Sequence, residues 1–500
     1  MGLRTAVLAA VASGLLYFLA FAGMDVWPLA FVAFVPLLVA VRGQSPSRAF
    51  ALGLLTGTTA SVAGIYWLLG MLQTFSGFPA PVCAIFVLAL CTYQGGWGGV
   101  HMWLVSRAEA RGWPFSLAVV LGFATAELLY PLLFPFYFAA TVHSVPVLAQ
   151  SAELGGPILV GVLLVIANVA LAELVSARIQ RRKADRRVLL VSLVVTALSL
   201  VFGFWRVVRV DRMVASAPSA TVGVVQANMG LLEKRNDSYE GLRRHLTLTR
   251  GLSDIDFVVW SETSVMQPIE ESSLEVIERG VGQDIGVPAI FGAVLYRFEP
   301  PPRDVAMFNT ALSTDVKGRV NGRFDKAHLL MFGEYLPFGE WFPALYGWSP
   351  QSGRFSPGKS LEPLVIDLGG VKHPVSTLVC YEDILPSFTN TLVHHGSPEL
   401  LVNMTNDAWF GDTIEPWQHL ALAKFRAIEH RRFLVRATNS GVSAVIDPVG
   451  RVVAKTATSR EGTLRVPIRW LRGTTVYEVL GDAPWIAVSL LSVVGAMVRR

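Results

Sequence analysis

Apolar runs long enough to cross a lipid bilayer fill the N-terminal part of this chain and return at its end. A transmembrane helix needs about 20 consecutive apolar residues, within a usual range of about 17–25. Only 16% of the 500 residues are charged, whereas a soluble domain has roughly a quarter. Much of the chain must therefore lie in lipid. The expected spans, of which the second and the last are short, are 5–22, 26–41, 49–72, 81–105, 114–134, 155–176, 187–205 and 480–498.

The segment between the seventh and the last apolar run has the composition of an ordinary globular domain. Its length is sufficient to bury one large core. We therefore expect three parts: a membrane domain of about seven helices over 1–212, a soluble domain over 218–475, and a terminal transmembrane helix over 480–498. Short apolar runs alternate with amphipathic ones, which predicts an α/β sandwich whose sheets are covered by helices. The expected strands are 222–226, 257–260, 289–292, 308–313, 375–379, 400–404, 433–437 and 443–446, and the expected helices are 239–252, 274–279 and 416–431.

Arginine is concentrated in every second loop between the apolar runs, and this pattern predicts the orientation of the chain. By the positive-inside rule, such loops face the cytoplasm. We therefore expect a multi-pass membrane protein with both termini in the cytoplasm and the soluble domain on the extracytoplasmic side. The net charge of +5 is modest and no basic patch is interleaved with aromatics, which argues against nucleic-acid binding. The basic groups are Arg4, Arg42 with Arg48, Arg107 with Arg111, the cluster at 178–187, and Arg499 with Arg500.

Two features of the N-terminal part leave alternatives. Arg206, Arg209 and Arg212 follow the seventh run on the side predicted to be extracytoplasmic, but a large domain translocates largely regardless of charge. The start of the chain, with Arg4 before an apolar run that ends in small residues, is also typical of a secretory signal. Because the next run follows almost at once, we expect the first helix to be retained as half of a hairpin.

The soluble segment contains one cysteine, Cys380, in the sequence Thr377-Leu-Val-Cys-Tyr-Glu-Asp383. The preceding β-branched run predicts a buried strand, and the cysteine stands where that strand ends. A turn after a strand can present a nucleophile while its backbone amides stay free to bind an oxyanion. The alternative is a buried structural thiol, which is the more frequent role of a lone cysteine.

Three further stretches carry polar side chains beside predicted strands. Glu262 follows an apolar strand, Lys326 and Glu334 lie in mixed sequence, and Asn403 begins a polar stretch that ends at Gly411. Each has a plain structural alternative, because Glu262 could cap a turn, Lys326 could be a solvated loop residue, and the stretch from Asn403 could be only a turn. Glu382, beside the cysteine, could simply pair with an arginine.

The order Glu262, Lys326, Cys380 resembles the nitrilase (carbon–nitrogen hydrolase) superfamily, whose members use a Glu-Lys-Cys triad on an αββα sandwich. The flanking residues resemble the apolipoprotein N-acyltransferase family more closely, and the resemblance covers essentially the whole chain. One departure is Arg235 after Lys234, where the family pattern leads us to expect an aromatic residue. The motifs that carry the resemblance are Trp260-Ser-Glu-Thr263, Lys326-Ala-His-Leu-Leu-Met-Phe-Gly-Glu-Tyr-Leu-Pro337, Cys380-Tyr-Glu382, Asn403-Met-Thr-Asn-Asp-Ala-Trp-Phe-Gly411, Pro416-Trp-Gln-His419 and Arg436-Ala-Thr-Asn-Ser-Gly441.

The resemblance implies a reaction and a set of roles. Cys380 is the expected nucleophile, Glu262 the general base and Lys326 the cation that stabilises thiolate and oxyanion. Glu334 is expected to orient Lys326 or the intermediate, while Tyr381 and Glu382 shape the pocket. The implied donor is a phospholipid, the acceptor is the diacylglyceryl-cysteine of an apolipoprotein, and the transfer is ping-pong through a thioester.

Two other functions compete with this interpretation. A membrane-tethered amidase would use the same triad but give its acyl group to water. A transporter or receptor would only bind a ligand, but the apolar half lacks mid-bilayer carboxylates or histidines. No metal or other cofactor is expected, because His394 and His395 are adjacent rather than spaced as ligands and no Gly-rich phosphate loop precedes a helix. The aromatic stretch 336–349 is either an arm that reaches the membrane interface or an ordinary core loop.

Overall fold

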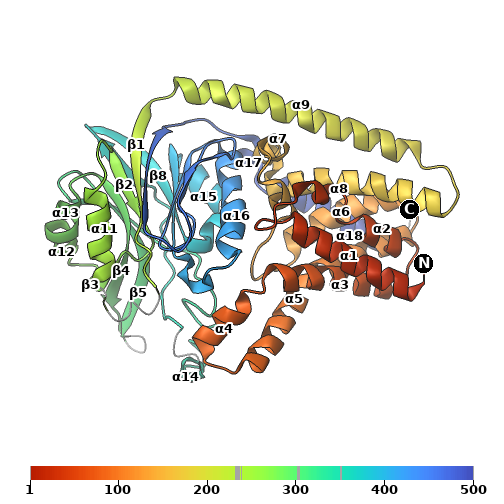
Figure 1. Ribbon diagram of the computed structural model, residues 1–500, viewed down its shortest axis with the longest axis horizontal. Helices are drawn as coiled ribbons and strands as arrows, with labels where there is room; N and C mark the ends of the chain where they lie inside the picture. Colours follow the sequence, from red (N-terminus) through yellow and green to blue (C-terminus); the bar gives the residue numbers. More distant parts are fainter. Residues whose placement is uncertain (1, 231–236, 238, 301–303, 349–351, 499–500) are drawn as a thin grey trace. The chain divides into compact units, whose positions relative to one another are not determined.

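The computed structural model describes residues 2–230, 237, 239–300, 304–348 and 352–498. The chain divides into two compact units (Figure 1). The first, here the helical unit, consists of Met1–Leu69, Pro79–Arg209 and Thr475–Arg500, and the second, the sandwich unit, of Gly70–Phe78 and Val210–Thr474.

The helical unit is built from long helices joined by short loops. Proline at the first turn starts several of them, because its fixed φ suits that position and its missing N–H needs no partner there. Helices α4 and α9 run from one unit into the other along the chain. The helices are α1 Leu3–Ala20, α2 Val35–Val41, α3 Pro46–Gly64, α4 Leu68–Ser76, α5 Ala80–Glu109, α6 Phe115–Leu129, α7 Pro146–Ala149, α8 Ala152–Ile179, α9 Arg186–Ser216, α17 Val476–Leu480 and α18 Ala483–Met497, with 3-10 helices η1 Trp27–Phe31 and η2 Phe138–Val142.

Within the described part of the chain, four helices are long and apolar enough to cross a membrane: α1, α5, α8 and α9. Helices α3 and α4 form a fifth candidate that is bent by 62°, and shorter apolar helices cover Trp27–Val41, Phe115–Leu129 and Ala483–Met497. Large apolar side chains on these helices are exposed, which is typical of a surface that faces lipid rather than water. The count of seven N-terminal spans and their boundaries stays a prediction.

Helices α3 and α5 touch through their backbones. A Cβ atom on Gly57 would lie 2.5 Å from the carbonyl oxygen of Gly95, and one on Gly53 would collide with the carbonyl oxygen of Gly98. Small residues are used for such close approach between membrane helices, because lipid supplies no hydrophobic driving force for their association. Glycine at these positions is therefore required by packing.

The sandwich unit contains two sheets, which the described residues form in the orders β13-β1-β2-β4-β5-β6, with β3 beside β4, and β12-β11-β10-β9-β8-β7. Their central strands are parallel and their outer strands antiparallel. The strands are β1 Ser219–Gln226, β2 Phe257–Trp260, β3 Val265–Glu270, β4 Ala289–Phe298, β5 Val305–Thr314, β6 Val320–Asp325, β7 Leu364–Leu368, β8 Val371–Val379, β9 Leu400–Thr405, β10 Leu434–Thr438, β11 Ala444–Ile446, β12 Val452–Lys455 and β13 Gly462–Arg469.

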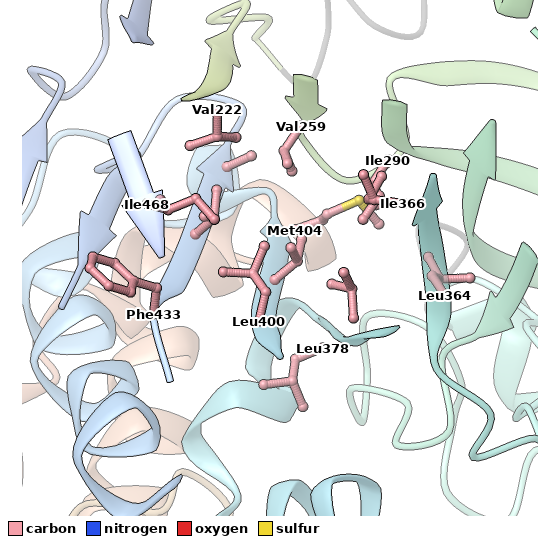
Figure 2. Close-up of a cluster of buried hydrophobic side chains, with 14 of the residues drawn as sticks. Val222, Val259, Ile290, Leu364, Ile366, Leu378, Leu400, Met404, Phe433 and Ile468 are labelled. Atoms are coloured by element: carbon pink, nitrogen blue, oxygen red, sulfur yellow. The ribbon is translucent and has the colours of Figure 1, made fainter. Parts of the chain in front are cut away.

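The alternation of side chains along each strand produces four layers. Val224 of β1 and Val402 of β9 belong to one core cluster, which lies between the two sheets (Figure 2). The neighbouring residues Val225 and Leu401 point the other way, toward the helices on the outer faces. The chain therefore forms the αββα sandwich that the sequence predicts. The outer helices are α11 Glu240–Arg250, α12 Glu275–Ile277 and α13 Gln283–Ile285 on one sheet, and α15 Pro386–Gly396 and α16 Glu415–His430 on the other.

All eight strands expected from the sequence are present, with ends that differ by several residues at most. The helix expected over 274–279 is short, because α12 gives way to a π-helical turn at Glu278–Gly282. The sequence interpretation missed β3, β6, β7, β12, β13 and α15.

Candidate active site

Cys380 stands directly after β8, as expected, and begins the 3-10 helix η4, Cys380–Ile384. Its φ angle is 55°, in the left-handed region that non-glycine residues rarely adopt. The side chain is buried and the cysteine is unpaired. A strained residue at a strand-to-helix turn is a typical position for a nucleophile, because the turn directs the side chain away from the strand.

Glu262, Lys326 and Glu334 meet at the ends of two strands of the other sheet. The Nζ atom of Lys326 lies 2.8 Å from Glu334 Oε2 and 3.5 Å from Glu262 Oε1. The side chain of Lys326 is only 1% exposed. Lys326 is therefore not a solvated loop residue, which was the structural alternative to a catalytic role. A buried ammonium requires such partners, because removal from water is costly for an unpaired charge.

Asn309 joins the two carboxylates of this cluster. Its side-chain N–H groups donate to Glu262 Oε1 at 2.7 Å and to Glu334 Oε1 at 2.8 Å. Asn309 lies in β5 and is 3% exposed. No role was predicted for Asn309 from the sequence, where it directly follows a run of four apolar residues, Val305 to Phe308.

The charges at the site act on one another. Burial alone would lower the pKa of Lys326, but Glu334, Cys380 and Glu262 raise it well above its usual value. Burial raises the pKa of the Cys380 thiol, and Glu262 adds to this increase, while Lys326 and a hydrogen bond with Thr405 oppose it. The resting side chain is therefore a thiol, and a base is needed to ionise it.

Tyr381 and Glu382, the two residues after the cysteine, have different surroundings. The ring of Tyr381 lies 6.0 Å from Lys326 Nζ, and burial raises the pKa of its phenol to about 12. Among the described residues no arginine forms an ion pair with Glu382, so the alternative of a carboxylate paired with an arginine is not what the structure shows. Its Oε1 atom accepts from the backbone N–H groups of Ala327 at 2.8 Å and His328 at 2.9 Å, and its Oε2 atom accepts from Val379 at 2.7 Å. Glu382 thus ties the loop after Lys326 to the strand before Cys380.

A second polar cluster lies behind the Cys380 turn. Asp383, Asp407, His419 and Arg436 are each at most 5% exposed and are joined by hydrogen bonds. Asn403 also belongs to this network rather than to a simple turn, since it lies in β9. Several of these residues belong to the motifs that carry the family resemblance, but no function was predicted for them individually. Among the described residues, Asp407, Glu415 and His419 also have donor atoms within 4.8 Å of one another, a spacing that suits a metal ion.

The aromatic stretch after Glu334 is not an ordinary core loop. Phe338, Trp341 and Phe342 are more than half exposed, although Tyr346 in the short helix α14, Leu345–Trp348, is buried. The last residue of the stretch, Ser349, lies outside the described residues, as does the Lys234–Arg235 departure from the family pattern.

Comparison with known proteins identifies the family. Residues 13–170 match the apolipoprotein N-acyltransferase N-terminal domain, and residues 221–471 match the carbon–nitrogen hydrolase family. The chain is 31% identical to the apolipoprotein N-acyltransferase of Geobacter metallireducens, over 99% of this chain and 96% of that protein. It is 28% identical to the protein of the same name from Bdellovibrio bacteriovorus, over 98% and 93%.

Among solved structures, a cysteine-to-alanine mutant of the Nesterenkonia AN1 amidase from the nitrilase superfamily is 19% identical, with a TM-score of 0.38, over 54% of this chain and 98% of that one. The two family matches and the near full-length relatives together cover the helical and the sandwich parts of the chain. This chain belongs to the apolipoprotein N-acyltransferase family.

Proposed function

We propose that this protein transfers an acyl chain from a phospholipid, with phosphatidylethanolamine as the expected donor, to the N-terminal amine of the diacylglyceryl-cysteine of an apolipoprotein. The observation that carries the proposal is the buried Glu262–Lys326–Glu334 cluster, whose charges act on the Cys380 thiol. Membership of the family supports acyl transfer to lipoproteins as the reaction. The catalytic triad in this proposal is Glu262, Lys326 and Cys380.

In the first half-reaction, Cys380 Sγ attacks the ester carbonyl of the phospholipid while Glu262 takes the thiol proton. The carbonyl oxygen becomes an oxyanion, which the ammonium of Lys326 stabilises. The intermediate collapses to a thioester, and the lysophospholipid leaves as an alcohol that takes the proton from Glu262. Glu334 holds Lys326 in position through the 2.8 Å contact.

In the second half-reaction, the acceptor amine attacks the thioester carbonyl. Glu262 removes a proton from the amine, the carbon–sulfur bond breaks, and the Cys380 thiol is restored with that proton. The products are an amide on the lipoprotein and the free enzyme. Because the same base serves both halves, a substitution of Glu262 should slow acylation and deacylation together.

A lipid donor explains why this site belongs to a chain with a membrane part. Each methylene withdrawn from the bilayer costs about 0.8 kcal/mol, so a donor that keeps its chains in lipid avoids a large penalty. The exposed rings of Phe338, Trp341 and Phe342 suit a segment that enters the membrane interface. We propose that the sandwich over 218–475 lies extracytoplasmically, between a membrane domain over 1–212 and a last helix over 480–498, with both termini in the cytoplasm of a bacterial inner membrane.

The test uses purified full-length protein in detergent with acyl-labelled phosphatidylethanolamine and no acceptor. We expect a hydroxylamine-sensitive acyl adduct on the Cys380 peptide in mass spectra, which then moves to the amine of an added diacylglyceryl-cysteine peptide. Glu262→Gln and Lys326→Ala should abolish the adduct. Glu278→Gln and Lys317→Ala, which change the same residue types away from the site, should not.

The competing functions predict other outcomes. Release of free fatty acid in the absence of acceptor would identify a hydrolase that gives the acyl group to water. An unlabelled Cys380, together with transfer that survives Cys380→Ser, would refute the thioester mechanism.

A further inference from the structure

The four buried side chains behind the nucleophile form a closed ring of alternating charge. Arg436 donates to Asp383 Oδ2 at 2.6 Å through Nη1 and to Asp407 Oδ2 at 3.2 Å through Nη2. His419 bridges the same two carboxylates from the other side, with Nε2 2.8 Å from Asp383 Oδ1 and Nδ1 3.2 Å from Asp407 Oδ1. Each acid therefore contacts both basic groups.

The geometry defines the charge of His419. Both ring nitrogens face a carboxylate oxygen, so both must carry a proton for the contacts to be attractive. With His419 as an imidazolium, the two cations balance the two carboxylates. A neutral imidazole would direct a lone pair at one carboxylate and leave a net negative charge in a buried site.

Two further ionisable groups act on this ring, Glu415 and the Cys380 thiol, both of which interact with Arg436. The Oε1 atom of Glu415 lies 3.7 Å from His419 Nδ1, on the same helix α16. Burial and the charge of Asp407 raise the pKa of Glu415 well above its usual value, while His419 and Arg436 oppose this increase. The groups that face His419 are thus Asp383 from η4, Asp407 from the 3-10 helix η5 (Asp407–Phe410), Arg436 from β10, and Glu415 from its own helix.

The ring is connected to the nucleophile by two routes. Asp383 belongs to the same turn η4 as Cys380. Asn403 supplies the other route, because its Oδ1 accepts from Arg436 Nη1 at 2.8 Å and its Nδ2 donates to the carbonyl oxygen of Cys380 at 2.9 Å. The ring therefore restrains the turn whose first residue has φ of 55°. Left-handed backbone at a cysteine persists only where the surroundings enforce it.

A metal ion between Asp407, Glu415 and His419 is the alternative use of this cluster. The donor spacing permits one, but Arg436 already contacts Asp407 and both nitrogens of His419 already have carboxylate partners. The protein thus supplies its own positive charge, and a divalent ion would have to displace the Nδ1 proton of His419.

We propose that His419, as an imidazolium, and Arg436 are positioning residues that hold the Cys380 turn in its reactive conformation through Asp383 and Asn403. This inference rests on the proposed function in one respect, namely that Cys380 is the nucleophile. It assigns to helix α16 and strand β10 a part in the reaction that is exerted through the turn of Cys380.

The first test compares His419→Gln with the wild type in single-turnover acylation of Cys380 by labelled phosphatidylethanolamine. Loss of one cation leaves the ring unbalanced, and we expect acylation to be roughly 100-fold slower, the scale of a misplacement of about 1 Å in an active site. The KM for phospholipid should be unchanged, since the ring does not bind lipid. His373→Gln is the matched control, because His373 is also paired with a buried carboxylate, Glu399, but on the far part of β8.

A charge-balanced double variant separates positioning from simple loss of stability. Asp383→Asn in the His419→Gln background removes one anion as well as one cation, and acylation should recover relative to His419→Gln alone. Additive losses in the double variant, or wild-type acylation by His419→Gln, would overturn the proposal. So would a stoichiometric metal that copurifies with the wild type and is lost from His419→Gln.

Alkylation of Cys380 by iodoacetamide, followed on its peptide by mass spectrometry, keeps this test independent of the proposed function. It needs neither lipid nor turnover, so it reports the state of the turn even if no acyl-enzyme forms. His419→Gln should be alkylated faster than the wild type, with an altered pH profile, because the turn that buries the thiol is loosened. An unchanged alkylation rate and pH profile would refute the positioning role of His419. Altered alkylation without any acyl adduct in the wild type would refute only the proposed function.

Discussion

Glu382 is the residue at which a single-atom change has the most definite expected result. Its two oxygens accept three backbone N–H groups, two from the loop after Lys326 and one from Val379 before Cys380. The side chain is fully buried, so water cannot replace a lost bond. In Glu382→Gln, the amide oxygen can keep the two bonds to the loop, but the NH2 group then faces the N–H of Val379. At least one buried donor, the N–H of Val379, is then left unsatisfied.

The magnitude follows from that count. An unsatisfied buried donor costs roughly 1–3 kcal/mol. Because 1.36 kcal/mol corresponds to a tenfold change in rate, this cost is equivalent to about a 5- to 150-fold slower reaction. We expect the loss in the acylation rate, since the broken bond joins the segments that carry Lys326 and Cys380. Glu382→Ala removes all three acceptors and should be slower still.

The assay is single-turnover acylation of Cys380 at saturating labelled phospholipid, with thermal unfolding measured on the same preparations. Glu278→Gln is the control, because Glu278 also accepts a backbone N–H, that of Val320 at 2.9 Å, at the start of the strand that leads to Lys326. If Glu382→Gln unfolds like the wild type and acylates at the wild-type rate, the argument that this carboxylate connects the two halves of the site is wrong.

Three further predictions follow from the geometry. Asn309→Asp replaces both donors to Glu262 and Glu334 with a third carboxylate, and single-turnover labelling should show acylation at least about 100-fold slower; near-normal labelling would contradict the role of the amide. Cys380→Gly should have a free energy of unfolding up to about 1 kcal/mol higher than Cys380→Ala, and so a higher melting temperature, because left-handed backbone is disfavoured for alanine. Equal melting temperatures would show that the turn is unstrained. Burial and Arg436 would lower the pKa of His419, but Asp383 and Asp407 raise it from 6.5 to about 10. Between pH 6.5 and about 10 the folded state therefore binds one more proton than the unfolded state. The stability that this proton contributes should be fully present below about pH 6.5 and should fall as the pH rises to about 10, by at most about 1.4 kcal/mol per pH unit. The same pH dependence of thermal unfolding in His419→Gln as in the wild type would refute this.

The central strands of the sandwich were predictable because each contains a continuous run of apolar, often β-branched residues, which indicates a buried strand without any information from the rest of the chain. The run before Cys380 is β-branched and continuous, and it forms the buried end of β8. The missed strands lie mostly at the sheet edges, where side chains are partly exposed and the apolar signal is weak. Strand β13, for example, alternates exposed and partly buried positions along most of its length, and its partner β1 lies more than 200 residues earlier in the chain.

The candidate site was only partly predictable for a related reason. Glu262, Lys326 and Cys380 were found through their order and flanking motifs, not through any local sign of burial. The bonds of Asn309 reach Glu262 and Glu334, which are 47 and 25 residues away along the chain, and no periodicity reports such contacts. Glu382 was expected to shape the pocket, but its contacts were not predicted because its partners are backbone N–H groups, which carry no residue-specific signal in a sequence.

The division of the site between two sheets has a consequence for the synthesis and folding of the protein. Glu262, Asn309 and Lys326 come from one sheet, whereas Cys380 comes from the other, more than 50 residues later. A nascent chain that has made strands β1 to β6 carries the proposed base and cation but not yet the cysteine, and the last strand of that sheet, β13, follows Cys380 in the sequence. The proposed triad can therefore come together only after β13 has been made and the two sheets have packed against each other. The fold itself thus ties assembly of the proposed site to completion of the domain.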